Sequence, residues 1–465
     1  MATAEPFAAP PGPPRPPASP LGDRSVRLLL ATNFLFTVGV FVQATALGKL
    51  VYDISGRKLD LGLLGLAEFA PAVALVLVTG HVADRFDRRK IGALSFVGDV
   101  VCAIGFALYA HSKPTAVGPI FALAVLFGAM RAFGAPAVRA LPANVAPTGT
   151  LPKVTAFNST MWQSALIIGP VAAGFLYAGS TMLPFAVAAV LIALAVVTIL
   201  LVRLPGRAGG GVAVATADAS PVAESDDDEK PSIRAALDGL RFIRRTPILL
   251  AAISLDLFAV LFGGAVALLP AIAEERLHVG AVAFGWLRAA GGVGAVLMAA
   301  LLALKPIRRH IGRSLLAAVT VFGIATVLLG ITRNYVVAFV AVAVLSGADM
   351  ISVFVRATLV PLVTPDQVRG RVLAAENVFI GASNELGAFE SGVVGQLFGT
   401  VGAVVSGGVL TIAVAALWWF RFPALRDVDR FTDLDVPGGP GRPDLAGSPG
   451  PSGPPGRAQS SDSPG

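Results

Sequence analysis

Twelve long apolar stretches, separated by charged loops, limit what this chain can form. A stretch of about 20 apolar residues, folded as a helix, crosses the ~30 Å hydrocarbon core of a bilayer. Only 14% of the residues are charged, whereas a soluble domain has about 25%. The sequence therefore predicts an all-α membrane protein with twelve transmembrane helices. The predicted spans are residues 26–50, 61–80, 91–110, 117–140, 156–178, 182–203, 247–271, 281–304, 313–331, 335–359, 372–398 and 402–420.

A long polar segment divides these spans into two sets of six. It holds the acidic run 225–230, which fits a solvated linker better than a metal site. Arginines then alternate with apolar residues over 233–245, which predicts a basic amphipathic helix on the inner membrane surface. The expected domains are a disordered Pro-rich tail at 1–24, a six-helix half at 25–204, a linker at 205–246, a second six-helix half at 247–421 and a disordered tail at 422–465.

Arginine and lysine gather in the loops after the second, fourth, eighth and tenth spans. The positive-inside rule places these loops, and both termini, in the cytoplasm. The net charge of +7 is therefore attributed to membrane topology, and no nucleic-acid partner is expected.

The two halves also resemble each other in sequence. The segment VRALPANVAPTGTLPKVTAFN is followed by GPVAAG, and VRATLVPLVTPDQVRGRVLAAEN is followed by GAFESG. With a one- or two-residue gap, Gly169 aligns with Gly387 and Gly174 with Gly392. This period agrees with the division into six and six, and it predicts two parallel pseudo-repeats with a binding site between them.

The loop between the second and third spans reads GHVADRFDRRK, residues 80–90. It resembles the G-x-x-x-D-R-x-G-R-R-x signature of the major facilitator superfamily, with Asp87 in place of the usual glycine. The resemblance implies a loop that packs against the eleventh span and latches the outward-facing state, with Asp366, Arg369 and Arg371 as candidate partners. The residues that match the signature are Gly80, Asp84, Arg85, Arg88, Arg89 and Lys90.

Two further motifs carry the resemblance. Gly169, Pro170 and Gly174 are similar to the G-P-x-x-G-G motif of the superfamily's exporters, with Ala173 in the first glycine position of its final pair. The stretch 364–392 resembles a bacterial branch that includes enterobactin-exporter-like and macrolide-efflux-like proteins. The resemblance implies a proton-coupled exporter of small amphipathic molecules, drug-like or siderophore-like, in the bacterial cytoplasmic (inner) membrane.

Two other functions remain open. A nutrient uptake permease has the same fold, and the Gly-Pro motif is the argument against it. A non-transporting membrane sensor would be expected to carry a folded soluble domain, and the polar segments lack the pattern of a buried core.

Ionisable residues inside the spans are candidates for the transport machinery, because a charge at membrane depth needs a cavity or a partner. Asp256 and Glu385 are the first candidates for proton coupling, followed by Glu68 and Asp349. Arg131 and Arg288 are expected as their cationic partners or as contacts for an anionic substrate. Asn33 and Asn384 are expected to be polar cavity residues. The alternative for any one acid is a fixed structural ion pair.

Other kinds of chemistry have no support in the sequence. There is no G-x-x-x-x-G-K-[ST] loop for nucleotide phosphates, and the four histidines are scattered. The single cysteine excludes an internal disulfide. We expect no enzymatic activity, cofactor or metal; the expected partners are a small-molecule substrate, protons and membrane lipid, and the expected state is a monomer.

Overall fold

The computed structural model describes residues 19–147, 149–203 and 233–434, and in these ranges all regular structure is helical. Predictions for 1–18, 204–232 and 435–465 lie outside the described residues. The elements are η1 (Pro20–Gly22), α1 (Arg24–Ser55), α2 (Lys58–Arg85), α3 (Arg88–His111), α4 (Gly118–Val145), α5 (Leu151–Gly179), α6 (Leu183–Leu201), α7 (Ile233–Arg245), α8 (Pro247–Phe262), η2 (Gly264–Leu268), α9 (Leu269–Glu275), α10 (Ala281–Leu304), α11 (Ile311–Ile331), α12 (Tyr335–Val363), α13 (Asp366–Arg421), α14 (Pro423–Arg426) and η3 (Phe431–Asp433).

The described helices account for twelve membrane passes. Ten helical segments are long and apolar enough to span, counting α8 to α9 as one and α13 as one. At Gly399 the backbone leaves helical geometry (φ 80°, ψ 164°), so the 56 residues of α13 form two passes. The 28-residue α2 packs against α4 and α13 and is the remaining pass.

Polar caps set where several of these helices begin. The Asp23 side chain accepts hydrogen bonds from the backbone N–H groups of Ser25 and Val26 at the start of α1. Asn334 does the same for the first turn of α12. Such caps satisfy backbone donors that have no partner within the helix.

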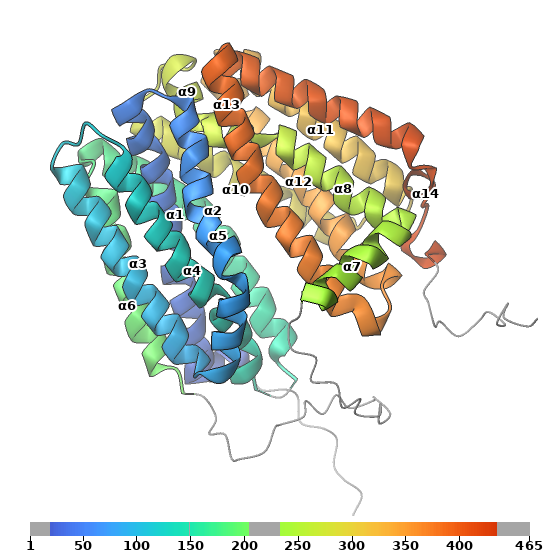
Figure 1. Ribbon diagram of the computed structural model, residues 1–465, viewed down its shortest axis with the longest axis horizontal. Coiled ribbons are helices and arrows are strands. Elements are labelled where there is room, and N and C mark those ends of the chain that lie inside the picture. Colours follow the sequence, from blue (N-terminus) through green and yellow to red (C-terminus); the bar gives the residue numbers. More distant parts are fainter. Residues whose placement is uncertain (1–18, 148, 204–232, 435–465) are drawn as a thin grey trace, which may run out of the picture.

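The helices form two bundles, α1–α6 and α8–α13, which lie side by side (Figure 1). In the first bundle α1 packs on α5 and α6, and α3 packs on α4 and α6; in the second α8 packs on α13, and α10 and α11 pack on α12. The bundles meet along two helix pairs, α2 with α13 and α5 with α10. In Figure 1 they lie together at the end that holds α9 and diverge towards the end that holds α7.

The aligned glycines occupy equivalent contacts in the two bundles. A Cβ at Gly174 of α5 would lie 3.0 Å from the Cα of Gly285 in α10, and one at Gly392 of α13 would lie 3.1 Å from the Cα of Gly62 in α2. Both positions therefore need glycine where one bundle meets the other. These equivalent contacts confirm the two pseudo-repeats predicted from the sequence.

The seventh predicted span is confirmed as one candidate membrane pass, Pro247–Glu275, but it is not one continuous α-helix. Helix α8 ends at Phe262, a 3₁₀ segment follows, and α9 completes the pass. Helix α13 packs tightly against the break, since a Cβ at Gly264 would collide with the carbonyl oxygen of Gly387.

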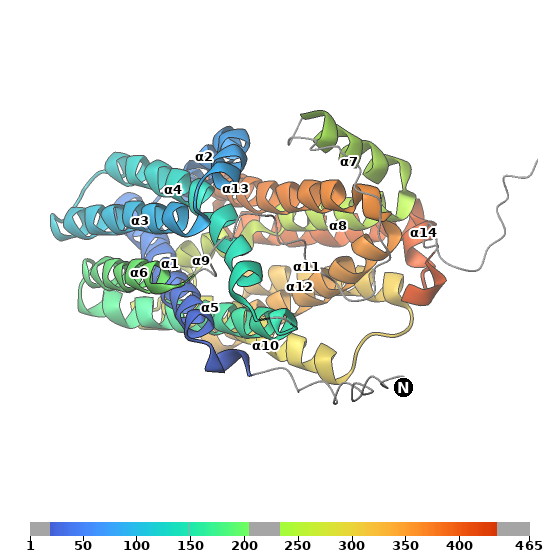
Figure 2. The ribbon, with the colours of Figure 1, turned by 90° about the horizontal axis from the view of Figure 1, so that it is seen from below.

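Two peripheral segments pack more closely than the sequence suggested. Residues 422–434, expected to be part of a tail, bury Leu425, Val428 and Leu434 against the second bundle. Helix α7 was expected to turn its apolar face to the membrane. It packs instead on α13 and α8, at the edge of the second bundle (Figure 2). Ile243 is only 2% exposed, while Arg244 and Arg245 stay exposed.

Candidate functional site

A cavity of about 380 Å³ lies between the two bundles, and we call it the central cavity. Five of the predicted site residues line it: Glu68 from α2, Arg288 from α10, Asp349 from α12, and Asn384 and Glu385 from α13. The lining therefore holds three carboxyl groups and one guanidinium group. Because both bundles line this cavity, a movement of one bundle against the other would change its exposure.

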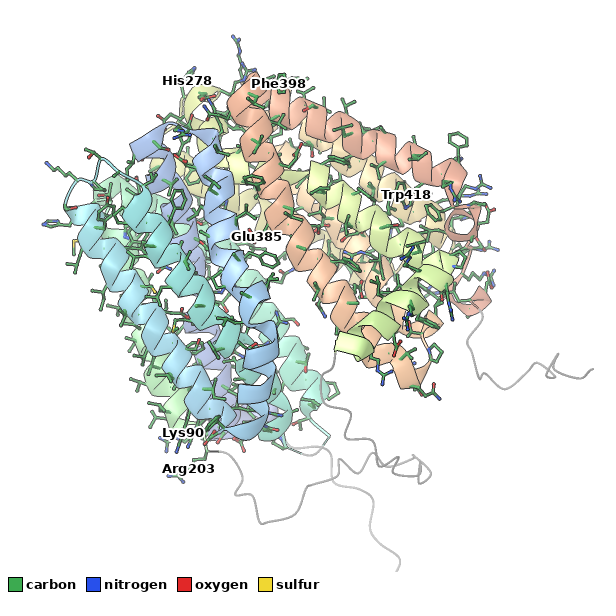
Figure 3. All side chains as sticks on the ribbon, in the orientation of Figure 1. Lys90, Arg203, His278, Glu385, Phe398 and Trp418 are labelled. Carbon is green, nitrogen blue, oxygen red and sulfur yellow. The ribbon has the colours of Figure 1, made fainter. Side chains whose placement is uncertain are left out.

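Glu385 extends from α13 towards the first bundle (Figure 3). Its carboxyl group lies so close to Gly65 of α2 that a Cβ there would collide with Oε2. No described residue donates a hydrogen bond to Glu385 or forms an ion pair with it. This carboxyl group is therefore available to a proton or to a ligand.

Glu68 has a loose ion pair with Arg131 of α4, with Oε2 and Nη1 4.0 Å apart. Arg131 also lies over the ring of Phe127, 5.4 Å from its centroid. Its side chain is 45% exposed and lines a second cavity rather than the central one. The Glu68–Arg131 ion pair therefore links the lining of the central cavity to the lining of the second cavity.

The second cavity, about 550 Å³, lies within the first bundle, and we call it the arginine cavity. Arg131 and Arg139 are its charged lining residues, and none of its described lining residues is acidic. The Asn33 amide on α1 donates to the Asn158 carbonyl on α5 at 2.7 Å, so this predicted residue lies here and not in the central cavity. Trp162 adds an aromatic surface.

Asp256 lies in a buried ion network and does not line either cavity. Arg356 of α12 lies 2.9 Å from Asp256 on α8 and 3.2 Å from Glu376 on α13. The Ser352 hydroxyl also donates to Asp256, at 3.3 Å. Arg131 and Arg288 were expected as the partners of Asp256. Instead Arg356 is 4% exposed and is itself the partner.

The loop signature is described only in part. The side chains of residues 80–85, which include Gly80, Asp84 and Arg85, lie outside the described set. Arg88 begins α3, and the Arg89 guanidinium donates to the Val202 carbonyl at the end of α6, at 2.8 Å.

Asp87 has a clear structural role. It caps α3 by accepting a hydrogen bond from the Arg89 backbone N–H at 2.9 Å. The acid that replaces the signature glycine is thus a helix cap, and the sequence analysis missed this role. Asp366, a proposed latch partner, pairs with Arg369 at 2.6 Å within its own helix.

The exporter-like motif lies where α5 meets α1 and α10. Gly169 lets α5 approach Phe41 of α1, and Gly174 faces Gly285 of α10. A Cβ at Gly285 would lie 2.5 Å from the carbonyl oxygen of Pro170. These residues therefore set the spacing between the two bundles.

A group of charged and hydroxyl residues that the sequence analysis missed ties the bundles together at the α9 end. Glu275 of α9 accepts hydrogen bonds from Tyr52 of α1 and Thr400 of α13, each at 2.5 Å, and forms an ion pair with Lys58 of α2. Lys49 of α1 pairs with Glu274 at 3.2 Å. We call these six residues the clasp; opposite charges at the ends of neighbouring spans are its only trace in the sequence.

The described residues hold no group of three His, Cys, Asp or Glu side chains that could bind a metal. What the site offers is carboxyl and guanidinium groups in two cavities. Such groups can bind protons and small ionic or polar ligands.

One family model and one relative each match most of this chain. A family model described as "Transmembrane secretion effector" (MFS_3) matches residues 16–439. A protein of Bacillus subtilis (strain 168), described as the uncharacterized MFS-type transporter YfiS, is 25% identical over 410 residues, which cover 85% of this chain and 92% of the relative.

Solved structures show the same fold. A bacterial homolog of the human lysosomal transporter Spinster, in an inward-facing and unoccupied conformation, has a TM-score of 0.64 at 15% identity and covers 87% of this chain and 98% of its own. A D-xylose-proton symporter has a TM-score of 0.66 at 13% identity and covers 88% and 99%. These likenesses confirm the predicted fold of twelve helices in two repeats. The narrower resemblance to enterobactin and macrolide exporters stays a prediction.

Proposed function

Because the chain belongs to the transmembrane secretion effector family of major facilitator superfamily transporters, we propose that it exports small amphipathic molecules in exchange for protons. Drug-like and siderophore-like molecules are the proposed substrates. The two bundles would rock about the central cavity, and the clasp would hold one end of it closed. Both termini and α7 would lie on the cytoplasmic side.

The observation that carries this proposal is the central cavity between the bundles, with Glu385 exposed to it and without a described partner. A carboxyl group that loses and gains a proton as its surroundings change can couple a proton gradient to transport. Glu68 and Asp349 line the same cavity and are further candidates for this role. Asp256 has a stable cationic partner, which favours a structural role for it.

Uptake of an anion together with a proton is the second candidate. The sharing of Arg131 between Glu68 and the arginine cavity favours it. A substrate anion that pairs with Arg131 takes the counter-ion of Glu68, and a carboxylate that loses its counter-ion in an apolar site binds a proton more readily. Anion and proton would then be bound together, as symport requires.

Dye transport into everted membrane vesicles tests the proposal. Export predicts that vesicles energised to be acidic inside accumulate amphipathic dyes, and that a protonophore abolishes the accumulation. Vesicles without the protein are the control. No accumulation of any dye in a broad panel, combined with proton-driven entry into right-side-out vesicles, would instead support uptake.

A further inference from the structure

The central cavity and the arginine cavity differ in charge. The central cavity has three acidic lining residues and one basic one, while the arginine cavity has two basic residues and no described acid. The two cavities therefore favour ligands of opposite charge. The acidic lining suits protons, and the basic lining suits an organic anion.

The two arginines of this cavity differ in their contacts: Arg131 pairs with Glu68, and Arg139 has no described partner. Arg139 is exposed in the cavity, and no described residue forms a hydrogen bond or ion pair with it. Arg131 lies eight residues earlier on α4, about 12 Å along the helix axis at the usual rise. Arg139 lies at the inner end of the predicted fourth span, and its exposed, unpaired guanidinium is available for ligand contact.

The rest of the lining suits a molecule with an aromatic body. Trp162 is 52% exposed and packs edge-on against Phe41, with ring centroids 5.5 Å apart. Phe36 and Phe96 also line this cavity, and their rings stack with centroids 4.0 Å apart. Rigid aromatic walls bind flat apolar groups, and guanidinium groups stack on or pair with their anionic substituents.

One polar pair completes the site. Asn33 donates to the Asn158 carbonyl oxygen, and this leaves the Asn158 amide N–H groups without a described acceptor. A carboxylate or sulfonate on a ligand would satisfy them. The cavity volume of about 550 Å³ lies within the usual range of about 300–1,000 Å³ for small-molecule sites.

We propose that the arginine cavity binds small aromatic organic anions, with Arg131 and Arg139 contacting the anionic group and Trp162 the ring. This inference rests on the proposed transport function, in either direction, and names its substrate class. The central cavity then serves proton coupling, and the Glu68–Arg131 pair is the only described ion pair between the linings of the two cavities.

Equilibrium binding of radiolabelled 2-naphthoate to the full chain in liposomes tests the proposal. Its neutral analogue 2-naphthamide has nearly the same shape and lacks the charge. We expect naphthoate to bind at least about tenfold more tightly, as the loss of a charge-assisted hydrogen bond implies. Equal binding of the two, or tighter binding of a naphthyl ammonium cation, would overturn the proposal.

Matched variants locate the site. Arg139→Gln should weaken naphthoate binding about tenfold, Arg139→Lys should recover part of it, and Arg308→Gln, outside both cavity linings, should leave it within about twofold. The proposal fails if Arg308→Gln has an equal or larger effect. The binding result is independent of proton-driven dye transport. Naphthoate binding without proton-driven transport contradicts only the coupling, and proton-driven transport of cations without naphthoate binding contradicts only the substrate class.

Discussion

The Arg356 guanidinium on α12 lies 2.9 Å from the Asp256 carboxylate on α8, with both residues at most 5% exposed. Glu376 of α13 shares the same guanidinium at 3.2 Å. Three helices of the second bundle are thus joined by one cation and two acids. Removing the cation leaves two buried negative charges, while removing Asp256 leaves a balanced pair.

The two substitutions should therefore differ sharply in stability. Arg356→Gln should cost about 3–5 kcal/mol of unfolding free energy, because buried charges are left uncompensated. Asp256→Asn should cost about 1 kcal/mol, since an amide still accepts the Ser352 hydroxyl and the Arg356–Glu376 pair remains. Thermal denaturation in detergent measures both. Equal destabilisation by the two variants would contradict this description of the network.

The clasp makes a prediction about conformation. Glu275→Gln removes the ion pair with Lys58, so the α9 end should open more often. Cysteine introduced at Ala44, in the central cavity, reports this opening through its reaction with an impermeant maleimide added on the Glu275 side. Loss of one charge-assisted contact predicts a rise of about tenfold in the reaction rate.

Glu274→Gln is the matched control for the clasp. It removes only the Lys49 contact of a side chain that is 54% exposed, and exposed ion pairs contribute about 0–1 kcal/mol. Its labelling rate should stay within a few-fold of the parent. If both variants open the cavity equally, Glu275 has no special part in closing it.

Packing between the bundles can be tested at Gly174. The Cβ of Gly174→Ala would lie 2.7 Å from the carbonyl oxygen of Ala281 in α10, so α5 and α10 must separate. Overpacking of this kind costs about 1–3 kcal/mol. We expect slower transport at normal expression, measured as an initial rate per mole of protein.

Gly179→Ala, in the same helix, provides the comparison. Its new Cβ would meet only the flexible end of Leu183, at 3.3 Å, so transport should be unaffected. Parent-like transport by Gly174→Ala would show that the close contact between bundles is dispensable.

The bilayer determines most of what could be predicted from the sequence. Apolar length predicted the spans, and the alignment of Gly174 with Gly392 predicted a repeat that the contacts with Gly285 and Gly62 confirm. The break in the seventh span was missed, although the Gly263-Gly264 pair marks the place where α13 comes close to it.

Side-chain partners were harder to predict than helices. The depth of a residue in the membrane can be estimated from its position in a span. On that basis Glu68, Asp349 and Glu385 were expected in the transport site, and all three line the central cavity. The direction of each side chain depends on how the helices pack. For that reason Asp256 was expected in the cavity but lies beside Arg356, and the contacts of Glu275 could not be foreseen.

Proton movement on binding distinguishes the two directions of transport. Export in exchange for protons predicts that an amphipathic substrate releases protons when added to detergent-solubilised protein in weak buffer, because substrate and proton compete. Symport of an anion predicts proton uptake instead. A pH-indicator dye measures the sign, and Glu68→Gln identifies the contribution of the carboxyl group that shares Arg131.

We propose that Glu385 in the central cavity couples transport to protons. Comparing substrate exchange with gradient-driven transport in Glu385→Gln tests this role. Glu390→Gln, on the same helix and outside the cavity lining, is the control. In Glu385→Gln, the rate of transport driven by a pH gradient should fall about tenfold or more. Substrate exchange across the membrane without a gradient should continue. Gradient-driven transport at the parent rate in Glu385→Gln would show that Glu385 does not couple transport to protons.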